Sequence, residues 1–217
     1  RHLLLDSRRA GPPAGTLFVA LRGPSHDGHR YLPQAYAGGV RLFLVEENAE
    51  LPGGLGAYPG AGIVAVNNTL GALQAVAAAH RAAFSGPVWA ITGSNGKTIV
   101  KEWMAQLLGP DEVVCRSPRS YNSQVGVPLS VWELNPERHT LGLFEAGISE
   151  VGEMARLAVI IQPTEGIFTN LGTAHDAGFA SENEKLREKL RLFQGPRFRR
   201  LYYCADHEPV RAAVEEL

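Results

Sequence analysis

Residues 91–98 read Ile-Thr-Gly-Ser-Asn-Gly-Lys-Thr, and the surrounding sequence predicts a buried strand at Val88–Ile91 and a helix at Lys97–Leu108. A glycine loop between a strand and a helix is typical of phosphate binding, because the first turn of a helix offers unpaired backbone N–H groups and a positive dipole end. Gly93 and Gly96 allow the backbone to turn tightly and to approach phosphate oxygens. The pattern therefore predicts a nucleotide-binding α/β domain.

The cationic and hydroxyl side chains of this loop predict how a nucleotide would be held. Lys97 is placed to reach the β and γ phosphates, and Thr98 to bring its hydroxyl to Mg²⁺. The loop departs from the pattern G-x-x-x-x-G-K-S/T, because Ile91 stands where the first glycine would be. A helix that begins Gly-Lys-Thr by chance is the alternative, and the flanking strand and helix disfavour it. The predicted nucleotide-binding residues of the loop are Gly93, Ser94, Asn95, Gly96, Lys97 and Thr98.

The rest of the second half of the chain alternates between strands and helices. Apolar runs predict strands at 140–144, 166–169 and 201–204, and periodic segments predict helices at 151–161, at 182–193 and after Asp206. This alternation favours a mostly parallel sheet covered on both faces. We therefore expect residues 85–217 to form a phosphate-loop domain of the α/β class.

Residues 1–84 are predicted to form a separate, small α/β domain. Strands are expected near Leu3–Leu5 and at Leu17–Leu21, Val40–Val45 and Ile63–Val66, with helical turns at 31–37 and a Gly- and Pro-rich loop at 51–62. Thr69 is predicted to cap a helix that runs to Phe84. The expected hinge between the domains is Ser85-Gly86-Pro87.

Composition indicates a soluble globular protein and excludes some partners. The chain is 45% hydrophobic and 20% charged, and its formal net charge of −1 gives no basic surface of the kind that nucleic acids attract. No apolar run approaches the roughly 20 residues of a membrane helix, so no membrane insertion is expected. Cys115 and Cys204 are far apart, and we expect two buried reduced thiols rather than a disulfide or a zinc site.

Polar residues follow two further predicted strands. Glu145 comes directly after the strand at 140–144, and Asn170 and His175 follow the strand at 166–169. A carboxylate at the carboxyl end of a parallel strand, near a phosphate loop, suits Mg²⁺. A helix-capping or solvated carboxylate is the alternative for Glu145, and a packed or surface imidazole is the alternative for His175.

The phosphate loop followed by Lys101-Glu102 resembles the ATP loop of the Mur ligases, which join amino acids or a dipeptide to a UDP-linked muramoyl peptide. The segments around Glu145 and His175 match this family in the same order, as does Ser120-Tyr-Asn-Ser-Gln-Val-Gly-Val-Pro128. The resemblance implies ATP and Mg²⁺ as cofactors and Asn170 as a further nucleotide contact. The implied catalytic residues are Lys97, Glu145, His175 and Lys189, and the implied metal ligands are Thr98, Glu145, His175 and carbamylated Lys189. Asn122 is implied as a neutral ligand to substrate or phosphate, with a turn that caps its own backbone as the alternative.

The amino-terminal segment is similar to the UDP-binding domain of the same family. The matching residues are Asp6-Ser-Arg8, Gly15–Leu21 and Asp27-Gly-His29. Ser7 and Arg8 are implied to hydrogen-bond the uracil or the diphosphate, since an arginine suits phosphate. A surface turn with solvated arginines is the alternative.

Two lysines compete for a position that the family modifies. On the helix at 182–193 the family carries a lysine carbamylated by CO₂, which turns a cation into a carboxylate-like Mg²⁺ ligand. Counting from His175 without gaps places Lys189 there, with Phe193 matching the aromatic residue that follows. Lys185, four residues earlier on the same helical face, is the competitor. An ordinary solvated charged face is the alternative for either lysine.

The run from Glu145 to Glu153 resembles the cytoplasmic type that adds D-alanyl-D-alanine to a UDP-N-acetylmuramoyl tripeptide through an acyl phosphate. These two molecules are the partners that the resemblance implies. Residues 116–128 look like a branch in which the ligase is fused to an alanine racemase. The resemblance also implies that the central domain is truncated at residue 217 and that a carboxyl-terminal amine-binding domain is absent. The chain alone is therefore expected to be inactive.

Three other functions stay open at this point. Another Mur ligase or a folylpolyglutamate-type ligase would share the ATP module, although the Asp-Ser-Arg segment disfavours the folate enzyme. A non-catalytic nucleotide- or UDP-substrate-binding module would keep the fold and lose the metal ligands, which the presence of Glu145 and His175 disfavours. A plain P-loop hydrolase would act without any muramoyl substrate.

Overall fold

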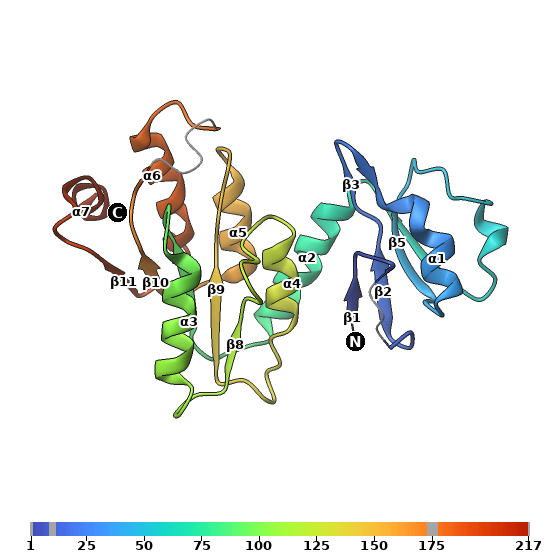
Figure 1. Cartoon of the computed structure of the whole chain (residues 1–217), viewed down its shortest axis with the longest axis horizontal. Helices are drawn as coiled ribbons and strands as arrows, with labels where there is room; N and C mark the ends of the chain where they lie inside the picture. Colours follow the sequence, from blue (N-terminus) through green and yellow to red (C-terminus); the bar gives the residue numbers. More distant parts are fainter. Residues whose placement is uncertain (1, 9–11, 173–177, 217) are drawn as a thin grey trace. The chain divides into compact units, whose positions relative to one another are not determined.

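The computed structural model describes residues 2–8, 12–172 and 178–216 and divides into two compact units, residues 1–73 and 74–217 (Figure 1). The division falls inside α2 (Thr69–Ala82), whereas the sequence placed it after residue 84. The reason is that α2 serves two cores: Leu73 packs among the strands of the first unit, while Ala77 belongs to the core of the second. The functions assigned to the two domains stay predictions.

The first unit is a four-stranded parallel sheet in the order β1-β2-β5-β6. Its elements are β1 (His2–Leu4), β2 (Thr16–Val19), β3 (Arg22–Gly23), β4 (His26–Asp27), η1 (Gly28–Tyr31), α1 (Leu32–Ala37), β5 (Leu42–Glu46), η2 (Leu55–Ala57) and β6 (Gly62–Val66). Alternate side chains of β2 and β5 enter two apolar clusters, because successive strand residues point to opposite faces. Phe18 and Phe43 pack with Leu32 of α1, and Val19 and Leu44 pack with residues of the opposite face.

The cap of α2 differs from the prediction. Asn68 caps the helix, since its Oδ1 accepts a hydrogen bond from the backbone N–H of Gly71 at 3.0 Å. The Thr69 hydroxyl is buried and donates instead to the carbonyl of Ala20 at 2.9 Å. A tertiary partner 49 positions away has therefore replaced the local capping role.

The second unit is a five-stranded parallel sheet in the order β11-β10-β7-β9-β8. Its strands are β7 (Val88–Thr92), β8 (Val114–Arg116), β9 (Leu141–Glu145), β10 (Glu165–Phe168) and β11 (Arg200–Tyr203), and its further helices are α3 (Lys97–Leu108), α4 (Gly126–Trp132), α5 (Glu153–Ile161), α6 (Glu182–Leu190), η4 (Arg191–Phe193) and α7 (Glu208–Glu215). α3 packs on one face of the sheet, and α4, α5 and α6 contribute to the core on the other. The predicted α/β class with mostly parallel strands is confirmed.

Strand order fixes where a ligand can bind in this unit. From β7 the chain builds β8 and β9 on one side and then β10 and β11 on the other. The carboxyl end of β7 is therefore the point where the direction of winding reverses, and parallel sheets bind ligands at such points. The phosphate loop follows β7 at this position.

The short strand β8 and helix α4 were not predicted. Cys115 is buried as expected, but Cys204 is exposed, because it follows β11 at the edge of the sheet. Among the described residues, no helix combines the length and the apolar character that a bilayer crossing requires.

Candidate phosphate and metal site

The loop between β7 and α3 needs both of its glycines. Gly96 adopts a left-handed conformation, with φ of 80°, at the start of α3. Gly93 has φ of 136°, and a Cβ atom at this position would lie 2.0 Å from the Thr169 Oγ1. Only a residue without a side chain fits between the loop and the end of β10.

The end of β10 holds the loop in place. Asn170 accepts two hydrogen bonds from it, one at its backbone carbonyl from the Ser94 N–H at 2.8 Å and one at Oδ1 from the Asn95 N–H at 3.0 Å. The Thr169 hydroxyl donates to the Asn95 carbonyl at 2.6 Å, and the Ser94 hydroxyl bonds both backbone groups of Gly172. Because the N–H groups of Ser94 and Asn95 are engaged, the backbone donors left for a phosphate include those of the first turn of α3.

Lys97 folds back onto its own loop. Its Nζ donates to the carbonyls of Gly93 at 2.8 Å and Ser94 at 3.2 Å. Burial lowers the pKa of Lys97 below its usual value, and the charge of Glu145 opposes this shift. The ammonium is thus held at the mouth of the loop, where an incoming phosphate would exchange with backbone carbonyls.

Glu145, at the end of β9, joins the loop to two other predicted site residues. Its side chain is fully buried. Its Oε2 accepts a hydrogen bond from the Thr98 hydroxyl at 3.1 Å and a long one from the Asn122 Nδ2 at 3.5 Å. Thr98, Asn122 and Glu145, which are far apart in the sequence, therefore meet at the carboxyl ends of adjacent strands.

The surroundings of the second carboxylate oxygen of Glu145, Oε1, indicate whether a metal cation can bind beside it. Oε1 is buried and lies 3.0 Å from the Lys101 Nζ, but this ion pair lacks hydrogen-bond geometry, so Oε1 accepts no hydrogen bond from any described residue. A buried carboxylate oxygen with an unused lone pair is costly unless another ligand completes it. Glu145 and the Thr98 hydroxyl offer the oxygen ligands that Mg²⁺ prefers.

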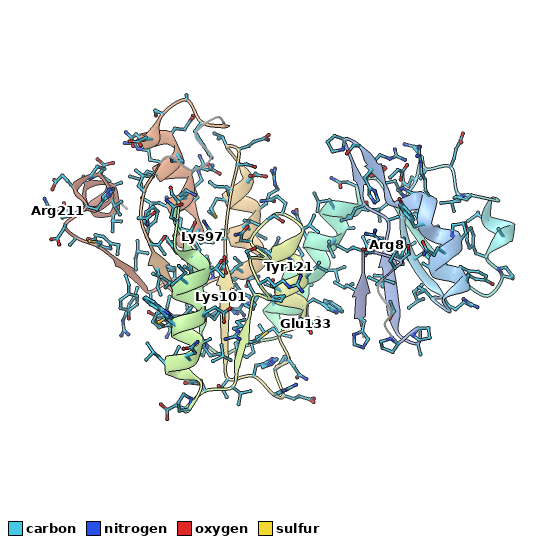
Figure 2. All side chains as sticks on the ribbon, in the orientation of Figure 1. Arg8, Lys97, Lys101, Tyr121, Glu133 and Arg211 are labelled. Atoms are coloured by element: carbon cyan, nitrogen blue, oxygen red, sulfur yellow. The ribbon has the colours of Figure 1, made fainter. Side chains whose placement is uncertain are left out.

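All four lysines of the chain lie near this site, and their restriction to two short segments is a sequence signal that the motifs alone did not use. Lysine occurs only at positions 97, 101, 185 and 189. The first two lie on α3 (Figure 2), and the other two lie on α6. Lys101, Lys185 and Lys189 are almost fully buried. Because buried cations are rare unless they are paired, such a gathering indicates a polyanionic ligand.

The two lysines of α6 are not on a solvated face, so that alternative is wrong. Lys189 donates to the Gly93 carbonyl at 3.4 Å, and Lys185 donates to the carbonyl of Gly172. Burial first, then the charges of Lys97 and Lys185, lower the pKa of Lys189 from 10.5 to about 8. This lowered pKa gives Lys189 a larger share of reactive neutral amine near neutral pH than an exposed lysine has.

His175 falls in residues 173–177, which lie outside the described residues, so its predicted metal role stays a prediction. Among the residues that the structure does describe, no three His, Cys, Asp or Glu side chains cluster as a metal site would require. Among the described residues, Glu145 is therefore the carboxylate that we consider as a candidate metal ligand.

In the first unit, the side chains predicted to bind the uridine diphosphate form hydrogen bonds with other side chains of the same unit. The Ser7 hydroxyl donates to the Gln34 Oε1 at 2.8 Å. The Arg8 guanidinium makes two 2.8 Å hydrogen bonds to the Asp6 carboxylate. The Arg8 side chain is 78% exposed and remains accessible, because exposed ion pairs are weak and exchange readily. The substrate roles of Ser7 and Arg8 stay predictions.

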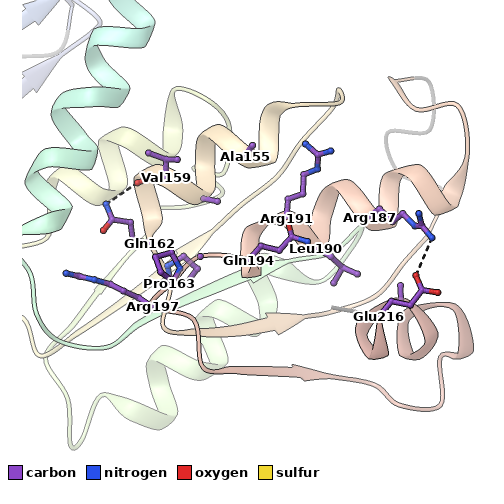
Figure 3. A pocket seen from close by; sticks show the side chains of 14 residues that line it. Ala155, Val159, Gln162, Pro163, Arg187, Leu190, Arg191, Gln194, Arg197 and Glu216 are labelled. Carbon is purple, nitrogen blue, oxygen red and sulfur yellow. Dashed lines mark hydrogen bonds and ion pairs between the residues drawn. The ribbon is translucent and has the colours of Figure 1, made fainter.

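A cavity elsewhere in the second unit does not bring its cationic side chains together. It measures about 770 Å³ and lies between α5, α6 and α7. Figure 3 shows that its three arginines do not converge: Arg187 turns to pair with Glu216, while Arg191 and Arg197 extend in other directions. The phosphate loop is therefore the better candidate for an anionic ligand.

Comparison with known proteins agrees with this geometry. The sequence profile of the Mur ligase middle domain matches residues 91–216, which is more than half of the chain. The chain belongs to the Mur ligase family. Its similar relatives include the UDP-N-acetylmuramoyl-tripeptide–D-alanyl-D-alanine ligases of Synechocystis, 39% identical over 78% of this chain and 36% of the relative, and of Bacillus subtilis, 31% identical over 82% and 38%.

Solved structures of family members have the same fold. MurF ligase from Thermotoga maritima, crystallised in complex with ADP, superposes with a TM-score of 0.85 at 25% identity over all of this chain and 48% of its own. MurF from Acinetobacter baumannii gives a TM-score of 0.84 at 27% identity over 99% of this chain and 46% of its own. The chain thus spans less than half the length of each of these four relatives.

Proposed function

We propose that this chain provides the UDP-substrate-binding and ATP-binding parts of a cytoplasmic ligase that adds D-alanyl-D-alanine to a UDP-N-acetylmuramoyl tripeptide. The observation that carries the proposal is the buried carboxylate of Glu145, whose Oε1 accepts no hydrogen bond from the described residues. It lies beside the Thr98 hydroxyl at the end of the phosphate loop, and α3 and α6 contribute buried lysines. The relatives that carry this activity support the choice of substrate. The fused alanine racemase finds no support among them and stays a prediction.

The reaction needs an activated carboxylate. A carboxylate is a poor electrophile at neutral pH, and transfer of the ATP γ-phosphoryl group to it creates an acyl phosphate, from which phosphate leaves when an amine attacks. Such a transfer depends mainly on positioning and charge neutralisation. Lys97 and the first turn of α3 would hold the β and γ phosphates. Asn122 would orient substrate or phosphate beside Glu145.

Thr98, Glu145, His175 and carbamylated Lys189 are the proposed metal ligands. Bound Mg²⁺ would neutralise the charge that develops on the transferred group. The carbamate on Lys189 forms only from a neutral amine, which the lowered pKa of Lys189 favours. The anion so formed would lie among Lys97 and Lys185, whose charges stabilise it.

Glu145→Gln tests the proposal against a matched control. The assay is ATP-dependent formation of the acyl phosphate, trapped as a hydroxamate, in the longest protein that contains residues 1–217. We expect Glu145→Gln to lose it, because the variant removes an anionic ligand for Mg²⁺. Lys97→Ala should lose it as well, because that variant removes the cation that holds the β and γ phosphates. Glu208→Gln is the control, since it removes an exposed carboxylate of α7 that pairs with Arg211. Normal turnover by Glu145→Gln would refute the proposal.

A non-catalytic module and a plain hydrolase remain the alternatives. Calorimetric titration with a UDP-muramoyl tripeptide distinguishes them, because a plain hydrolase would not bind it. Binding of the tripeptide without any acyl phosphate in the same protein would favour the non-catalytic module. Use of a different amine would instead identify another ligase of the same chemistry.

A further inference from the structure

Lys101 is one of the largest fully buried side chains among the described residues, and the proposed reaction assigns it no individual role. It lies on α3 one turn after Lys97, so the two side chains share one face of the helix. A buried ammonium costs several kcal/mol unless other groups replace its water. The partners of Lys101 therefore indicate what it does.

Oxygens from three separate segments surround the Lys101 ammonium. Its Nζ donates to the carbonyl of Ser117 at 2.8 Å and to the carbonyl of Arg119, in the loop after β8. It also lies 3.0 Å from Glu145 Oε1 and 3.1 Å from the carboxylate of Glu102 on its own helix. One side chain thus joins α3, the end of β9 and the loop that leads to Asn122.

The loop after β8 is held in an unusual conformation at the point of contact. Arg119 has φ of 52°, a left-handed conformation that costs a residue with a side chain about 1 kcal/mol. The same loop returns to β9 twice: the backbone N–H of Glu145 donates to the Ser117 hydroxyl at 3.2 Å, and Asn122 reaches Glu145 Oε2. Lys101 fixes both the carbonyl of Arg119 and the carboxylate that Asn122 contacts.

We propose that Lys101 is the positioning residue that sets the orientation of Glu145 and Asn122 at the metal site. It acts through the Glu145 carboxylate and the carbonyls of Ser117 and Arg119, which it contacts. This inference rests on the proposed function, since it assigns Lys101 the outer-shell role for a metal ligand. Removing such outer partners typically reduces metal affinity or activity about 10–100-fold.

Lys101→Met, which keeps an unbranched side chain one atom shorter and removes the charge, tests the proposal in the longest protein that contains residues 1–217. At saturating ATP and Mg²⁺ we expect turnover to fall about 10–100-fold. Binding of ADP without metal should change less than about threefold, because the first turn of α3 is untouched. Arg211→Met is the control, because it removes an exposed cation on α7 that pairs with Glu208, and it should keep normal turnover.

Metal preference separates positioning from a merely structural role. Mg²⁺ demands near-ideal octahedral geometry, and Mn²⁺ accepts oxygen ligands with less strict geometry, so a displaced Glu145 should harm the Mg²⁺ reaction more. We expect the ratio of Mn²⁺- to Mg²⁺-supported turnover to rise in Lys101→Met. Loss of folded protein alone would lower both rates equally and leave the ratio unchanged, and that outcome would overturn the proposal.

The variants Lys101→Arg and Glu145→Gln separate a folding defect from a failure of either proposal. If Lys101→Met does not fold, Lys101→Arg keeps the charge but presents a planar fork, and the same rise in the ratio is expected. An unchanged ratio in that variant would count against the positioning role. If Glu145→Gln also retains full turnover, the proposed function fails; if only the Lys101 variants retain it, the positioning role alone fails.

Discussion

Lys189 makes the folded protein less stable while its ammonium is charged, and this cost can be measured. The pKa of Lys189 falls from 10.5 to about 8, because the side chain is buried and faces the charges of Lys97 and Lys185. At about 1.4 kcal/mol per pKa unit, this difference corresponds to roughly 3 kcal/mol of destabilisation at neutral pH. The side chain is only 1% exposed, so solvent screening does not reduce this figure appreciably.

The sign of the pH dependence follows from the direction of the shift. Below pH 8 Lys189 is charged in both the folded and the unfolded protein, and the full cost is present. Between pH 8 and 10.5 the unfolded chain binds a proton that the folded protein does not, so the stability conferred at this site rises with pH. Above 10.5 the cost disappears.

We therefore expect Lys189→Met to be more stable than the parent protein at pH 7 in CO₂-free buffer, by up to roughly 3 kcal/mol. The measurement is the free energy of unfolding in urea at several pH values from 7 to 10, where the gap between the two proteins should close. Arg187→Met is the control: its side chain lies on the same helix but is 65% exposed, so its effect should be small and independent of pH.

Bicarbonate provides a second arm of the same experiment. If Lys189 is carbamylated, bicarbonate should stabilise the parent protein at pH 7 and leave Lys189→Met unchanged, because an anion then replaces a cation among Lys97 and Lys185. A stability gap that does not change between pH 7 and 10 would refute the reasoning about burial. A closing gap without any bicarbonate effect would refute carbamylation alone.

Two further predictions concern the frame of the site. Gly93→Ala should abolish ADP binding in calorimetry, because its Cβ would lie 2.0 Å from the Thr169 hydroxyl and move the loop; retained affinity would show that the loop tolerates the shift. Arg81→Ala should lower the free energy of unfolding by roughly 3 kcal/mol, since the buried guanidinium donates to the carbonyls of Ile161, Phe84 and Gln162 at 2.7–2.9 Å. A loss below about 1 kcal/mol in urea denaturation would mean that water replaces these bonds.

The sequence by itself determined the elements whose signals are local. The glycine loop between an apolar strand and a helix is one such signal, and α3 spans Lys97–Leu108 as predicted, because glycines, helix caps and apolar periodicity act within a few residues. The alternation of strands and helices likewise predicted a parallel sheet, and with it the meeting of Glu145 and the phosphate loop at one edge. The restriction of lysine to positions 97, 101, 185 and 189 is also visible in the sequence, but the search for apolar periodicity does not consider it.

Only the tertiary structure decided which groups share a partner. The Thr69 hydroxyl donates to the carbonyl of Ala20 instead of capping α2. The Asn170 side chain accepts a hydrogen bond from the phosphate loop, and the boundary between the two units falls inside α2. The burial of Lys101 against Ser117, Arg119 and Glu145 was equally hidden in the sequence. Each of these contacts joins residues far apart in the chain, and polar groups removed from water bond whichever partner the packing brings near, which no local pattern encodes.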